Sequence, residues 1–101
     1  MEEIKAKKGP ETGEEVVISV KVGKGDSSTN HKVTVDREDL ERLSPGESDI
    51  SAVKLVEESF KFLLEREPKE SILSSFNLTK IGDYFPEYQK EIKDRLKDSS
   101  R

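Results

Sequence analysis

The chain has 101 residues, 40% of them charged, and its formal net charge is −4 at pH 7. This length supports one domain with one modest core, and the absence of Cys excludes disulfides and thiolate metal sites. The net charge disfavours nonspecific nucleic-acid binding by the whole molecule, although it is compatible with a local basic patch. Because no apolar run approaches the roughly 20 residues that span a bilayer, we expect a soluble, cytoplasmic protein that does not enter a membrane.

The N-terminal part predicts a leader followed by a hairpin. Residues 1–13 mix both charge signs with Gly and Pro and show neither the helical nor the strand period, so we expect a flexible leader. Residues 15–22 alternate apolar and polar side chains, and the alternation resumes over residues 31–35. The stretch between them is rich in turn formers. This pattern predicts an antiparallel β-hairpin with a long flexible tip at residues 23–30.

The rest of the chain predicts helices. Asp36 is a suitable cap for a short helix over residues 36–43. Residues 48–67 form the longest strongly apolar run, and its apolar side chains spread over roughly 200° of the helical wheel. We therefore expect a central helix that at least two other elements cover. Further short helices are predicted at residues 68–76, 78–85 and 88–96, before a frayed tail at 98–101.

These elements together predict an α+β fold. We expect an N-terminal antiparallel β-hairpin packed on a cluster of four to five helices around the central helix 48–67, within a single domain of residues 14–97. A two-stranded sheet is marginal alone. The hairpin must therefore lie on the helices or gain strands from a second copy, which makes a homodimer through the hairpin edge an open alternative.

No catalytic, cofactor-binding or metal-binding residue is predicted. His31 is the single His, and no nucleophile or acid stands at a triad spacing from it, so we expect a surface or edge histidine. The carboxylates are abundant but do not follow the spacing of a calcium-binding loop. We therefore expect a noncatalytic protein, most simply a small protein-interaction or regulatory module with a protein partner.

An alternative function is nucleic-acid binding. The order strand, helix, turn, helix over residues 31–67 is similar to the ribbon-helix-helix DNA-binding fold, in which one strand from each protomer pairs and its outward polar side chains enter the major groove. Three features oppose this interpretation: the strand just upstream would pair within the chain, the helix 36–43 is short, and the net charge is negative. The contacts that it implies are Lys21, Lys24, Lys32, Thr34 and Arg37.

Residues 62–88 carry a more extended pattern, whose features are Leu63-Leu64-Glu65-Arg66-Glu67-Pro68, Ser71-Ile72-Leu73, Phe76, Leu78, Ile81 and Tyr84-Phe85-Pro86-x-Tyr88. This pattern resembles a motif of a group of small, uncharacterised prokaryotic proteins. The resemblance implies no activity and no ligand. The same region offers a candidate partner surface, each residue of which also has a purely structural interpretation as core or helix junction: Arg66, Tyr84 and Tyr88.

Overall fold

The two strands predicted from alternation form the middle of a β-sheet. In the computed structural model, which describes residues 3–43 and 52–99, β2 (Glu15–Val22) pairs antiparallel with β3 (Thr29–Asp36). The predicted hairpin is confirmed, but its tip is shorter than expected because Thr29 and Asn30 already pair with β2. The face turned toward the helices is formed by the buried side chains of Val16, Ile18, Val20, Val22, Val33 and Val35.

Two further strands extend this hairpin on both sides. β1 (Ile4–Glu11) pairs antiparallel with β2, and β4 (Ser75–Asn77) pairs parallel with β3, so the strand order is β1-β2-β3-β4. The prediction of a flexible leader is wrong for β1. Its two inward apolar side chains, Ile4 and Ala6, are only partly buried at the sheet margin, which explains why the alternation in the sequence is weak.

The segment that leads into β4 was predicted to be a helix, and this is also wrong. It contains one turn of 3₁₀-helix, η2 (Lys69–Ser71), and then extends along β3. The Lys32 N–H donates to the Ser74 carbonyl at 2.8 Å, and the Leu78 N–H donates to the Thr34 carbonyl at 2.9 Å. Pairing with a strand about 40 residues away in sequence thus overrides the local apolar spacing, which alone favours a helix.

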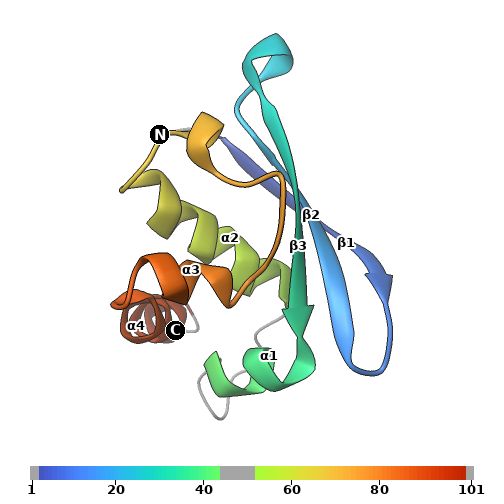
Figure 1. Cartoon of the computed structure of the whole chain (residues 1–101), viewed down its shortest axis with the longest axis vertical. Helices are drawn as coiled ribbons and strands as arrows, with labels where there is room; N and C mark the ends of the chain where they lie inside the picture. The colour runs from blue at the N-terminus through green and yellow to red at the C-terminus, as the bar shows by residue number, and fades with distance from the viewer. Residues whose placement is uncertain (1–2, 44–51, 100–101) are drawn as a thin grey trace.

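The helices lie on one side of this sheet (Figure 1). α1 (Arg37–Leu43) follows β3 directly, close to the predicted bounds, and α2 (Ala52–Leu64) is the predicted central helix. α2 ends three residues earlier than expected, and residues 48–51 of the prediction lie outside the described part of the chain. α3 (Lys80–Tyr84) and α4 (Tyr88–Ser99) complete the helical layer.

The predicted cluster of four to five helices around residues 48–67 is therefore wrong. The structure is α+β with a four-stranded mixed sheet, and α2 lies against β1 and β2 instead of within a helical bundle. In the described parts of the chain, 3–43 and 52–99, four α-helices are present. No helix there is long and apolar enough to cross a membrane.

α2 is covered on two sides, as its wide apolar surface predicted. Phe60 faces the sheet side, where its ring centroid lies 5.3 Å from that of His31. Phe62 faces the C-terminal helices, with its ring 5.3 Å from that of Tyr88 and 5.8 Å from that of Phe85. Both phenylalanines are fully buried. One helix therefore joins the sheet to α3 and α4.

Candidate functional site

His31 is buried, so the expected surface or edge histidine is wrong. Its side chain is 4% exposed, with Nδ1 2.7 Å from the Leu73 carbonyl oxygen and Nε2 2.8 Å from the Thr29 hydroxyl. Because a carbonyl oxygen only accepts, Nδ1 carries a proton and donates. Both ring nitrogens are thus used inside the protein, and the ring joins β3 to the segment before β4.

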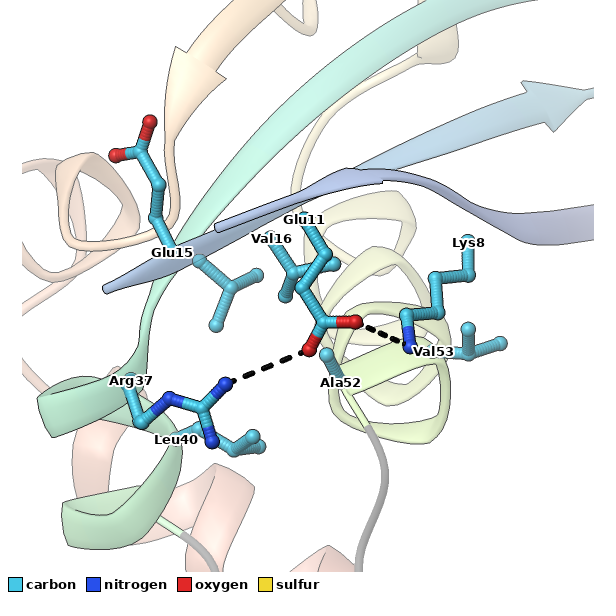
Figure 2. A pocket seen from close by; sticks show the side chains of 9 residues that line it. Lys8, Glu11, Glu15, Val16, Arg37, Leu40, Ala52 and Val53 are labelled. Carbon is cyan, nitrogen blue, oxygen red and sulfur yellow. Dashed lines mark hydrogen bonds and ion pairs between the residues drawn. The ribbon is translucent and has the colours of Figure 1, made fainter. Parts of the chain in front are cut away.

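Arg37, expected to contact nucleic acid, belongs to a small hollow of about 200 Å³ at the start of α1 (Figure 2). Its guanidinium donates to the Gly13 carbonyl at 2.8 Å and lies 3.4 Å from the Glu11 carboxylate. Lys8 approaches the same carboxylate at 2.5 Å, and this hydrogen bond lowers the pKa of Glu11. Glu15 points away from this group. The two described cations that line the hollow, Lys8 and Arg37, are thus both paired with the Glu11 carboxylate.

Within residues 3–43 and 52–99, no group of three or more His, Cys, Asp or Glu side chains is placed to hold a metal ion.

Tyr88, a candidate for the partner surface, lies in the core and is 1% exposed. Its hydroxyl is 2.6 Å from the Ser59 hydroxyl, which donates in turn to the Leu55 carbonyl at 2.7 Å. The Tyr88 hydroxyl therefore donates to Ser59, and burial raises the pKa of Tyr88 well above its usual range. Because Tyr88 is buried, it offers no surface to a partner, and its spacing from the other aromatic residues reflects core packing.

Arg66, the second candidate, ties α2 to α4. Its guanidinium carbon lies 3.6 Å from the centre of the Phe62 ring, and one nitrogen donates to the Phe62 carbonyl at 3.1 Å. The others reach the carboxylates of Glu87 and Glu91 at 3.2 and 3.1 Å. Its donors are engaged at the junction between α2 and α4. This agrees with the structural interpretation of Arg66 as part of a helix junction.

Tyr84, the third candidate, is exposed and lines an apolar groove of about 440 Å³. Tyr84 is 67% exposed and Leu73 is 48% exposed, and they are the two large apolar side chains that the described residues leave exposed. Both lie on this groove, between the end of α2, the segment before β4, and α3. Its other apolar lining residues are Leu63, Ile72, Phe76, Ile81 and Phe85.

Two charged side chains also line the apolar groove, Glu67 and Lys80. Glu67 is half-buried, and burial raises its pKa. Across residues 3–43 and 52–99, no hydrogen bond or ion pair engages the Glu67 carboxylate. The groove thus combines an apolar lining and the cation of Lys80 with one partly desolvated carboxylate, for which the described residues show no ion pair.

Two of the expected nucleic-acid contacts, Lys21 and Lys32, lie on the face of the sheet that is turned away from the helices, which we call the open face. The register places Lys5 opposite Lys21, and it places Ser19 between Lys7 and Lys32. Paired residues project from the same face. The four exposed lysines therefore form one group, which we call the lysine surface: Lys5, Lys7, Lys21 and Lys32.

The other expected contacts are placed less uniformly. Thr34 lies on the same face but is half-buried, and Lys24 is exposed in the turn beyond the lysine surface, before the short helix η1 (Gly25–Ser27). Arg37 lies at the far end of β3, in the hollow already described. The structure thus brings Lys21, Lys32 and Thr34 together on one face and separates Arg37 from them.

Among the described residues, β3 does not have the free edge that a ribbon-helix-helix dimer requires. β3 lies between β2 and β4, so it cannot pair with the β3 strand of a second copy while the sheet is intact. The same pairing covers both edges of the hairpin within one chain. The hairpin is thus part of a four-stranded sheet within one chain, and it does not need strands from a second copy at its edges.

Three residues of these two surfaces were not among the candidates predicted from the sequence: Lys5, Lys7 and Leu73. The lysines stand two residues apart and alternate with Ile4 and Ala6, which is a weak strand signal. Leu73 lies within the helix predicted over residues 68–76, which does not form. No local signal identifies its exposure, because this depends on where β3 draws the chain.

No family model matches the chain, and neither a curated protein nor a solved structure matches it. The resemblance of residues 62–88 to a prokaryotic group therefore stays a prediction.

Proposed function

We propose that the protein is a noncatalytic protein-interaction module that binds a short apolar segment of a partner protein in the apolar groove. The observation that carries this proposal is the position of Leu73 and Tyr84, which are the exposed large apolar side chains of the described residues and which both line this groove. Contiguous apolar surface in water is costly and marks interaction sites. A groove of about 440 Å³ accommodates a small number of anchoring side chains.

The charges of the groove specify the partner segment further. A half-buried carboxylate gains from a nearby cation, because an opposite charge offsets the loss of hydration. Glu67 is such a carboxylate. The proposed partner segment therefore carries apolar anchor residues followed or preceded by a Lys or Arg that reaches Glu67. A cytoplasmic location, expected from the sequence, remains part of this proposal.

The proposal is tested with a displayed library of random 12-residue peptides selected against the full chain. Peptides that bind are remeasured with purified Leu73→Ser and Tyr84→Ser proteins. Each substitution removes an exposed anchor, so we expect affinity to fall about tenfold or more while the fold is unchanged. Lys93→Ser, on the exposed side of α4, is the matched control and leaves the affinity unchanged.

The same peptides test the role of Glu67. We expect selected sequences to be enriched in Lys or Arg at one position beside apolar residues, and Glu67→Gln to weaken those peptides selectively. Peptides that bind all three groove variants as tightly as the unmodified protein would overturn the proposal. So would a selection that yields only acidic sequences that bind elsewhere.

A further inference from the structure

The lysine surface leaves its positive charge largely unneutralised. Among the described residues, the four lysines make one ion pair, between Lys5 and Glu3, with a nitrogen–oxygen distance of 3.8 Å. The nearest acidic pair in the register, Glu15 opposite Asp36, stands four residues along the strands from Ser19 and Lys32, roughly 13 Å away at 3.3 Å per residue. The chain has 22 acidic and 18 basic residues, yet four lysines gather on one face and none of their cross-strand partners is acidic.

This arrangement opposes the stability of the sheet. Lys5 and Lys21 are direct cross-strand partners, and like charges in such a position repel. Lys7 and Lys32 are separated only by the short side chain of Ser19. An anionic partner would relieve this repulsion, and nothing in the described residues does so apart from Glu3.

The shape and the remaining side chains suit a phosphate backbone. The lysine surface surrounds a shallow hollow of about 650 Å³, to which Ser19, Asn30 and Ser74 also contribute. Hydroxyl and amide groups donate hydrogen bonds to phosphate oxygens, and lysines attract them as point charges. The open face is the side of the sheet away from α2, α3 and α4, so a large ligand can approach it (Figure 1).

We infer that the lysine surface binds a nucleic-acid duplex through its phosphates, without reading the base sequence. Among the described residues, the hollow is lined by no aromatic side chain other than buried His31 and by no Arg. These residues therefore provide neither the stacking platform of single-strand binders nor the bidentate groups that read bases. An anionic lipid surface also attracts lysines. However, the exposed large apolar side chains of the described residues lie on the apolar groove, so none on this face could anchor in a bilayer.

The test is the anisotropy of a fluorescent 20-base-pair DNA duplex titrated with the full chain at several salt concentrations. Each phosphate contact contributes about −0.9 to the slope of log affinity against log salt, so four lysines give about −3.6. Raising the salt from 50 to 200 mM should therefore weaken binding about 150-fold. A duplex of unrelated sequence should compete equally well.

Variants locate the site. Lys7→Gln and Lys32→Gln should each reduce the magnitude of the slope by about 0.9, and the double variant by about 1.8. Lys93→Gln removes an exposed lysine of α4 and is the matched control, which leaves the slope unchanged. Circular dichroism and thermal unfolding verify that each variant folds. Tyr84→Ser should leave duplex binding unchanged, so this inference and the proposed function fail or succeed separately.

Several results would overturn the inference. One is that the protein does not bind the duplex at 20 mM salt. Another is that the Lys7 and Lys32 variants have the same slope of log affinity against log salt as the unmodified protein. A third is that a single strand binds more tightly than the duplex. Binding to vesicles with 30% anionic lipid that depends on the same lysines, with no binding to the duplex, would assign the lysine surface to a membrane instead.

Discussion

The Nδ1 atom of buried His31 lies 2.7 Å from the carbonyl oxygen of Leu73, whose side chain is exposed on the rim of the apolar groove. A residue of the core thus fixes the backbone that presents a residue of the surface. The two positions are 42 residues apart in sequence. The His31 ring also fills space beside Phe60, so it acts through both packing and hydrogen bonding.

His31→Ala should therefore destabilise the protein by about 2 to 4 kcal/mol. It leaves a cavity beside Phe60 and removes the partners of the Leu73 carbonyl and the Thr29 hydroxyl. Urea denaturation measures the change, with Lys93→Ala as the control within about 0.5 kcal/mol of the unmodified protein. In the same protein, kept folded at low temperature, peptides that bind the apolar groove should lose affinity. An unchanged affinity would mean that Leu73 is positioned without the histidine.

Gly9→Ala tests the pairing of β1. A Cβ atom at Gly9 would lie 2.9 Å from the Val17 carbonyl oxygen, so the backbone must shift. We expect a loss of about 1 to 3 kcal/mol in the free energy of unfolding. The matched control is Gly13→Ala, whose Cβ would meet nothing within 4 Å. Equal stability of the two variants would contradict the pairing of β1 at this point and favour a flexible leader.

The alkaline stability of the protein should depend on Tyr88. Burial raises the pKa of its phenol in the folded state, whereas in the unfolded chain the phenol titrates near pH 10. Above about pH 10 the unfolded state releases this proton and the folded state retains it, so the free energy of unfolding should fall as the pH rises. Tyr88→Phe should reduce this fall.

The same substitution should cost about 1 kcal/mol at pH 7, because the Ser59 hydroxyl loses its donor. Urea denaturation at pH 7 and pH 10.5 measures both effects. If Tyr88→Phe left the difference between the two pH values unchanged, the alkaline loss would have to come from other groups.

Lys21→Gln should stabilise the isolated protein. The substitution removes the repulsion between Lys21 and its cross-strand partner Lys5, and we expect a gain of a few tenths of a kcal/mol at low salt. Since salt screens exposed charges, the gain should shrink at 0.5 M salt. Thermal unfolding at both salt concentrations measures it, and Lys93→Gln is again the control. A loss of stability at low salt would show that the lysine has a favourable contact.

The valine pattern and the C-terminal stripe allowed part of this fold to be predicted. In β2, every second residue is apolar, and in α4 the buried residues Tyr88, Ile92 and Leu96 fall on one face. Such periods follow from local geometry alone. β1 and β4 contain few inward apolar residues, so their pairing is decided by neighbouring strands and leaves little trace in their own sequences.

The residues of the candidate sites could also be predicted only in part. Lys21 and Lys32 could be identified because they alternate with buried valines, but the sheet register that adds Lys5 is not visible in the sequence. Tyr84 could be identified as an aromatic candidate, whereas its neighbour in space, Leu73, could not. Tyr84 and Tyr88 belong to the same aromatic cluster in the sequence. Only the packing of α4 against α2 shows that Tyr88 is buried and Tyr84 is exposed.

Two consecutive residues of one short segment belong to opposite sides of the molecule. Leu73 lines the apolar groove and Ser74 lines the hollow of the lysine surface, and their carbonyl oxygens accept from His31 and Lys32, which are also consecutive. Any movement of this segment is therefore shared by both sites. If a ligand on one side shifts this segment into a position that binds the other ligand with a different affinity, thermodynamic reciprocity requires the second ligand to act on the first by the same factor.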